Sequence, residues 1–85
     1  MPVIVTIGEA LVEIVRTERD QPLDRPGDLS GPYPSGAPAI FASAAARLGS
    51  SAGLVGTVGA DPFGDCLWGR LLADGVDAAA IRRTS

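Results

Sequence analysis

The chain has 85 residues, of which 46% are hydrophobic, and its ten acidic side chains outnumber seven arginines to give a net charge of −3. It contains no histidine or lysine and a single cysteine, which excludes an intrachain disulfide, a histidine-based zinc site, a Ser-His-Asp triad, a Schiff base and a P-loop lysine. The absence of a basic block argues against nucleic acid or an anionic membrane as a partner, and we expect small-molecule ligands in a reduced, cytoplasmic setting.

The first third of the chain is predicted to be strand and loop. Residues 3–7 are a β-branched run ending at Gly8, the pattern of a strand buried on both faces of a parallel sheet. In residues 11–16 alternate side chains lie on opposite faces, with Glu13 on one face and Arg16 on the other among apolar residues, which predicts a half-exposed strand. Residues 17–34 carry four prolines and two glycines, so we expect a loop with a short strand near residues 28–30.

The next segment predicts a helix followed by a strand. The helix over residues 38–48 begins at a proline and ends at Gly49. Residues 52–58 are expected to be a second buried strand, joined to the first by a right-handed crossover. The expected apolar face of the helix consists of Ile40, Phe41, Ala44, Ala45 and Leu48.

A second helix is predicted from Pro62 to about Asp74, ending before Gly75, and residues 78–85 begin a further element. Its expected core positions are Phe63, Leu67 and Leu71, at four-residue spacing. We interpret Asp61 as the N-cap rather than a catalytic acid, Gly64 as a site of close packing, and Cys66, Trp68 and Tyr33 as packing residues.

This layout predicts a layered α/β fold around a parallel sheet. Two helices and at most three strands leave much of such a sheet uncovered. We therefore expect the isolated chain to be marginally stable or to self-associate. The glycines at positions 53, 56 and 59 do not have dinucleotide-binding spacing, so a Rossmann oxidoreductase is disfavoured.

Four motifs follow one another along nearly the whole chain: Gly8-Glu-Ala-Leu-Val-Glu13, Ser35-Gly-Ala-Pro-Ala-Ile40, Leu48-Gly49 and Val58-Gly-Ala-Asp-Pro-Phe-Gly64. With these motifs the chain resembles the N-terminal portion of the ribokinase/PfkB carbohydrate kinase family. The resemblance implies a ribokinase-like three-layer α/β/α parallel sheet with a small β lid, truncated after the second helix. Residues 1–85 would then be part of one domain, with a lid-like segment at 11–34 and a helix-strand-helix unit of the core at 35–85.

The resemblance also implies sugar-binding residues. Glu13 matches an acid that accepts hydrogen bonds from sugar hydroxyls, although spacing alone would make it a solvated strand residue. Gly36 and Ala37 match a glycine-rich turn whose backbone N–H groups approach the substrate, and the alternative is an ordinary helix start. Ser35 replaces the first glycine of the family pattern. Ile40 replaces an asparagine that commonly contacts sugar, so either Ile40 lines the pocket floor or the substrate is held from elsewhere.

The implied activity is transfer of the γ-phosphate of ATP, with Mg²⁺, to a hydroxyl of a ketose or sugar acid, tagatose being one candidate. Lids pair between subunits in several family members, so a homodimer through the lid is plausible. The family's catalytic aspartate lies in a Gly-x-Gly-Asp motif that this sequence lacks, and its nucleotide site belongs to the same missing part. We therefore assign no catalytic, cofactor or metal residue here and predict that the chain alone is inactive.

Two other functions stay open at this point. One is a non-catalytic α/β remnant that binds a polyol weakly or serves as an interaction module. The other is a nucleoside kinase of the same fold, which shares the motifs and is separated only by its substrates.

Overall fold

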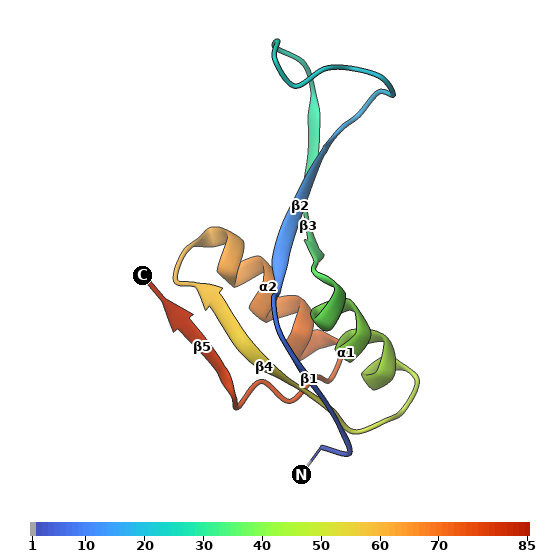
Figure 1. The fold of residues 1–85 in the computed structure, drawn as a ribbon, viewed down its shortest axis with the longest axis vertical. Helices are drawn as coiled ribbons and strands as arrows, with labels where there is room; N and C mark the ends of the chain where they lie inside the picture. Colours follow the sequence, from blue (N-terminus) through green and yellow to red (C-terminus); the bar gives the residue numbers. More distant parts are fainter. Residues whose placement is uncertain (1) are drawn as a thin grey trace.

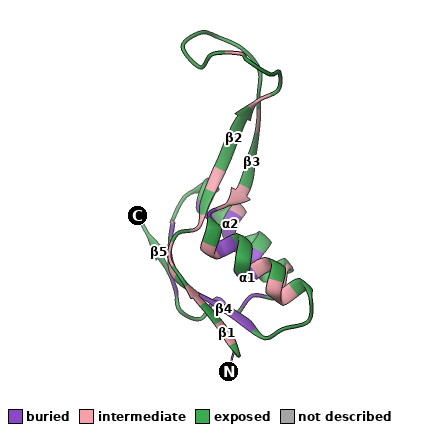
Figure 2. Ribbon diagram, turned by 45° about the vertical axis from the view of Figure 1, so that its right-hand side comes forward, coloured by how far each residue is buried: buried purple, intermediate pink, exposed green. Residues whose placement is uncertain are grey.

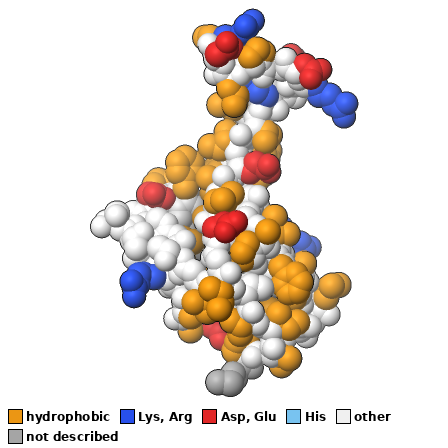
Figure 3. Space-filling model, viewed as in Figure 1, with side chains coloured by type: hydrophobic (Ala, Val, Ile, Leu, Met, Phe, Trp, Pro, Cys, Tyr) orange, Lys and Arg blue, Asp and Glu red, His pale blue; other side chains and the backbone are white. Residues whose placement is uncertain are grey.

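A computed structural model describes residues 2–85 as two sheets and two helices (Figure 1). A three-stranded sheet has the order β1-β4-β5, and a two-stranded ribbon of β2 and β3 projects away from it. This projection makes the molecule elongated (Figure 3), with extents of 47 × 30 × 19 Å. The elements are β1 (Ile4–Ile7), β2 (Leu11–Arg16), β3 (Leu29–Ser35), α1 (Ala37–Arg47), β4 (Ala52–Gly59), α2 (Pro62–Ala73) and β5 (Ile81–Thr84).

The three-stranded sheet is parallel throughout. Strand β1 pairs with β4, Ile4 lying opposite Ala52, and β4 pairs with β5, Gly56 lying opposite Ile81. Helix α1 lies between β1 and β4 in the chain, and α2 lies between β4 and β5. Parallel neighbours require such crossover connections. The predicted α/β class is therefore confirmed, and the element expected after residue 78 is strand β5.

Both helices cover the same face of this sheet (Figure 2). Strand β4 alternates so that Leu54 and Val58 point into the helix layer. Residues 2–85 thus form two of the three layers expected for the complete fold. The buried core cluster consists of Ala39, Ala42, Leu54, Val58, Leu67, Leu71, Val76, Ala78 and Ile81.

The prediction that the first strand is buried on both faces is wrong for this chain. Ile4 and Thr6 are half-buried against the helix side, whereas Val3, Val5 and Ile7 are exposed. The physical reason is that no element among residues 2–85 covers the second face of the sheet. A continuous β-branched run indicates a parallel strand correctly but does not reveal which faces are covered.

The predicted apolar face of the first helix is also wrong. The residues of α1 buried against the sheet are Ala39 and Ala42, while Ile40, Phe41 and Leu48 point outward. The Thr6 hydroxyl donates a hydrogen bond to the Pro38 carbonyl over 3.1 Å, which holds the start of α1 close to β1. At this short separation the small alanine side chains face the sheet.

Helix α2 begins as predicted. The Asp61 carboxylate accepts a hydrogen bond of 2.8 Å from the Gly64 N–H, which confirms the N-cap. Of the three core positions predicted at four-residue spacing in this helix, Leu67 and Leu71 are buried, whereas Phe63 is exposed.

The remaining packing residues lie at the edges of α2. Trp68 packs partly buried against the core, beneath the Arg83 guanidinium at 5.8 Å. Cys66 is only half-buried, because its thiol faces the ribbon and lies 3.8 Å from the Pro32 carbonyl oxygen. Cys66 therefore packs at the edge of α2 as a half-buried residue rather than within the core.

The uncovered sheet face predicts self-association. We expect the chain to associate through exposed Val3, Val5, Ile7 and Val55. Ile7→Thr keeps strand propensity but removes apolar surface, so it should weaken association severalfold. Leu23→Thr in the ribbon loop is a matched control, because Leu23 is 76% exposed and Ile7 77%. Sedimentation equilibrium measures both variants, and a monomer with a sharp, concentration-independent melting transition would contradict the expectation.

Candidate functional site

The candidate site lies where β1 ends, the ribbon begins and α1 starts. The Gly8 N–H donates to the Val55 carbonyl over 3.1 Å, fixing the end of β1 against β4. Gly36 is buried with φ +95°, and a Cβ there would lie 2.8 Å from the Glu9 carbonyl oxygen. Only glycine permits this approach and this backbone conformation together. The start of α1 is thereby held at the carboxyl edge of the sheet, where open α/β folds bind ligands.

The first turn of α1 is free to receive a ligand. Gly36 is the N-cap residue, no side chain caps the helix, and its first turn contains no acidic residue. Ala37 follows at the first helical position and is exposed. Backbone N–H groups at such a helix start, with the positive end of the helix dipole, attract oxygen-rich groups.

Glu13 lies on one face of the ribbon together with Tyr33. The two residues are directly paired across β2 and β3, whereas the neighbouring pair Val12 and Pro34 points to the opposite face. Val12 packs against the core, so Glu13 faces away from it. Within the described residues 2–85, no hydrogen bond or ion pair engages the Glu13 carboxylate. This carboxylate is therefore available to accept hydrogen bonds from a ligand.

A bulge in the ribbon lies next to Glu13. Glu13 pairs with Tyr33 and Val15 with Ser30, so Gly31 and Pro32 together oppose the single residue between Glu13 and Val15. Such bulges bend a strand and re-aim its side chains, and they are common beside functional sites.

Sequence analysis missed Tyr33 as a site residue. Tyr33 is 47% exposed rather than packed in the core, and its hydroxyl is hydrogen-bonded to the Ser30 hydroxyl. The cross-strand pairing with Glu13 is the signal that identifies it. That signal was hidden because the prolines at 32 and 34 argued against a strand there.

A shallow hollow of about 540 Å³ adjoins the junction on the uncovered face of the sheet. Glu9 lines it at the end of β1, and Arg82 lines it from β5. Sequence analysis assigned no role to Glu9, although its place directly after Gly8, at the end of a parallel strand, is a position typical of ligand contacts.

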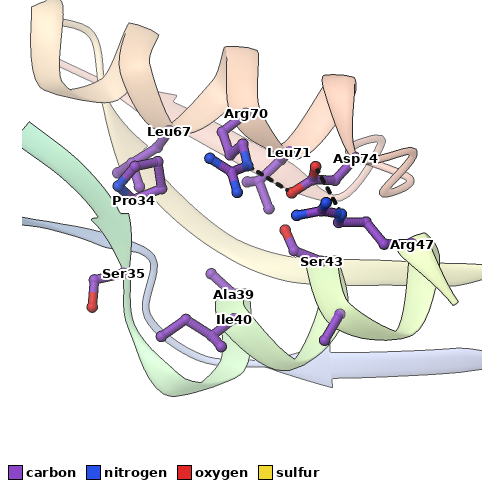
Figure 4. A pocket seen from close by; sticks show the side chains of 11 residues that line it. Pro34, Ser35, Ala39, Ile40, Ser43, Arg47, Leu67, Arg70, Leu71 and Asp74 are labelled. Atoms are coloured by element: carbon purple, nitrogen blue, oxygen red, sulfur yellow. Dashed lines mark hydrogen bonds and ion pairs between the residues drawn. The ribbon is translucent and has the colours of Figure 1, made fainter.

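The fourth predicted residue, Ile40, lies apart from Glu13. It is one turn into α1 and lines the edge of a groove between α1 and α2 (Figure 4). The structure thus brings Gly36 and Ala37 to the end of β1. The Leu11–Ser35 pair lies at the base of the ribbon, and Gly36 directly follows Ser35. Glu13 lies two residues, or about 7 Å, further along the ribbon from that pair.

The described residues contain no group of three or more His, Cys, Asp or Glu side chains that could hold a metal ion. None of the helices in residues 2–85 has the length and hydropathy needed to cross a membrane.

Comparisons with known proteins agree with this architecture. The profile of the pfkB family carbohydrate kinases matches residues 1–85. Probable fructokinase-4 of Arabidopsis thaliana is 44% identical over 79 residues, which cover 92% of this chain and 24% of that protein. Fructokinase of Escherichia coli is 36% identical over 77 residues, covering 91% of this chain and 22% of the relative.

Solved structures give the same result. A putative ribokinase II from E. coli, in complex with ATP and Mg²⁺, superposes with a TM-score of 0.95 at 50% identity, covering 99% of this chain and 27% of that one. A Xylella fastidiosa fructokinase with bound ATP gives a TM-score of 0.84 at 36% identity. This match covers 96% of this chain and 26% of the fructokinase chain. The chain spans about a quarter of the length of the proteins it matches. Because the family profile matches it from end to end, the chain belongs to the pfkB family of carbohydrate kinases.

Proposed function

We propose that the chain forms the substrate-side portion of a cytoplasmic, ATP-dependent sugar kinase that phosphorylates a hydroxyl of a ketose such as fructose. The observation that carries the proposal is the unpaired Glu13 carboxylate, displayed on the ribbon close to the uncapped start of α1. The relatives named fructokinases favour a ketose as the substrate class.

In this proposal Glu13 holds two vicinal hydroxyls of the sugar. A carboxylate accepts two hydrogen bonds in one plane and so fixes the orientation of the sugar ring. The backbone N–H groups at Gly36 and Ala37 contact a further sugar oxygen. Ile40 supplies an apolar contact where an amide would otherwise bind, and Tyr33 flanks Glu13 on the same face of the ribbon.

We propose further that the ribbon over residues 11–34 is a lid that closes over the sugar. Closure excludes water, which would otherwise compete with the sugar hydroxyl for the γ-phosphate. Exposed apolar side chains of the ribbon, Leu11, Ile14, Val15 and Leu29, favour a homodimer formed by pairing of two lids. Ile14→Thr should weaken a dimer formed through the lids. Ile7→Thr should instead weaken association through the uncovered face of the sheet.

Magnesium in phosphotransferases is held by one or two carboxylates together with the substrate phosphates. The Gly-x-Gly-Asp motif of the family does not occur in this sequence. We propose that nucleotide, metal and catalytic base are supplied by residues outside this chain, and that these 85 residues alone have no kinase turnover. Sugar-dependent production of ADP by the pure chain would contradict this.

Glu13→Gln is the direct test of the sugar site. The loss of charge-assisted hydrogen bonds costs about 1.5–3 kcal/mol, so we expect kcat/KM of the complete gene product to fall by about 10- to 100-fold. Glu18→Gln is the matched control, because it removes the same charge from the exposed ribbon loop. ADP release should be measured against ketoses, sugar acids, pentoses and nucleosides. Equal effects of the two variants would contradict the role of Glu13.

The same substrate panel separates the other candidate functions. Turnover with nucleosides alone would identify a nucleoside kinase. An absence of turnover with every compound, in a folded product, would identify a non-catalytic module.

A further inference from the structure

A groove between α1 and α2 has one apolar and one charged end (Figure 4). Its volume is about 200 Å³, and it lies on the helical side of the sheet, away from Glu13. Pro34 and Leu67 form the apolar end. Ser43, Arg47 and Asp74 lie at the charged end, where Arg70 also points toward Asp74.

The charges at this end are unbalanced. Asp74, whose side chain is only 10% exposed, receives a hydrogen bond of 2.9 Å from Arg70 Nε, while Arg47 Nε lies 3.9 Å from its other oxygen. One carboxylate therefore faces two guanidinium groups, leaving one positive charge. Among residues 2–85, neither guanidinium donates a hydrogen bond from its terminal nitrogens, and the Ser43 hydroxyl has no partner.

These free donors determine the kind of ligand that fits. The terminal nitrogens of a guanidinium form a planar fork that matches a carboxylate. A carboxylate would neutralise the one excess positive charge, whereas a phosphate dianion would leave an excess negative charge. A cavity of about 150 Å³ is large enough for benzene, so this groove has room for a carboxylate with a short apolar substituent.

We propose that the α1–α2 groove binds a small monocarboxylate, with its carboxylate between Arg47 and Arg70 and its apolar part against Pro34 and Leu67. This groove meets the sugar site proposed above at Ile40, which lines its edge, but it takes a different class of ligand, because a neutral sugar offers no anionic group to the two guanidiniums. Pro34 also pairs with Val12 at the base of the ribbon, so a bound ligand contacts the lid-like segment directly.

The test is a titration of the ¹⁵N-labelled chain with 4-methylpentanoate, followed by amide NMR. We expect saturable shifts in the helix segments 39–47 and 67–74. The neutral 4-methylpentanamide should bind at least about tenfold more weakly than the carboxylate, because it cannot form the charge-assisted hydrogen bond. Inorganic phosphate should also bind at least about tenfold more weakly, because its charge does not match the single excess positive charge of the groove. No saturable shift with the carboxylate, or equal binding of the amide or of phosphate, would overturn the proposal.

Three variants separate a binding role from a general charge effect. Arg47→Gln should weaken binding of 4-methylpentanoate about tenfold, and because Arg47 is 63% exposed the fold should be kept. Asp74→Asn removes the competing carboxylate and should strengthen binding severalfold. Arg82→Gln removes an equal charge on β5 and should change binding less than about twofold. If Arg82→Gln weakened binding as much as Arg47→Gln, the proposal would be wrong.

Discussion

Replacing Gly64 by alanine is expected to prevent cooperative folding of the chain. Gly64 is buried in the first turn of α2, and a Cβ at this position would overlap the carbonyl oxygen of Gly59 at the end of β4. Both clashing groups are held in place, because the Asp61 carboxylate binds the Gly64 N–H and Arg83 Nε donates to the Gly59 carbonyl. Overpacking in a core costs about 1–3 kcal/mol and more where the backbone cannot yield.

The expected cost is a large share of the total stability. A chain of 85 residues has a free energy of unfolding of roughly 4–13 kcal/mol, and this one lies toward the lower end because one sheet face is uncovered. Gly69→Ala is a matched control in the same helix, since a Cβ there meets nothing within 4 Å. It should stabilise the chain by about 0.5–1 kcal/mol. Urea unfolding followed by circular dichroism measures both, and a Gly64→Ala variant with unchanged stability would refute the packing described.

Gly36→Ala is expected to have the second largest effect, on both stability and sugar phosphorylation. The substitution places a Cβ in a left-handed backbone conformation, φ +95°, and against the Glu9 carbonyl oxygen at 2.8 Å. Backbone strain of this kind costs about 1–2 kcal/mol, and the clash with Glu9 adds a cost of similar size. Relief of the clash must move the start of α1 away from the end of β1.

The matched control for Gly36→Ala is Gly75→Ala. Gly75 has φ +86°, and a Cβ there meets nothing within 4 Å, so this variant carries the backbone strain without the clash. We expect Gly75→Ala to cost about 1–2 kcal/mol and to leave kcat/KM of the complete gene product unchanged. Gly36→Ala should cost more and should also lower kcat/KM about tenfold or more, because small displacements at a binding site are costly. If the two variants were indistinguishable in both measurements, the contact between Gly36 and Glu9 would have no role in the site.

Local patterns predicted the elements of the core well. Proline and glycine marked the ends of both helices, and the N-cap role of Asp61 depended only on neighbouring residues. The sequence pattern did not predict most of strand β3, because its two prolines argue against a strand. In a two-stranded ribbon, however, one edge of each strand is unpaired, so the proline positions need not donate a backbone hydrogen bond to a neighbouring strand.

Burial was harder to predict than secondary structure, because it depends on what covers each face. The apolar residues Ile7 and Phe41 suggested core positions, yet both are exposed in residues 2–85 and alanines occupy the helix–sheet contact. The same limit applies to the candidate site. Gly36 and Ala37 follow from a local turn, whereas Tyr33 and Glu9 join the site only through strand pairing and the approach of α1 to β1.

The central claim is that the junction of β1, the ribbon and α1 binds sugar. Titration of the ¹⁵N-labelled chain with fructose, followed by amide NMR, tests it most directly. We predict saturable shifts at Glu13, Tyr33, Gly36 and Ala37, lost in Glu13→Gln and retained in Glu18→Gln. Shifts that do not saturate, that lie outside this junction, or that persist unchanged in Glu13→Gln would contradict the claim.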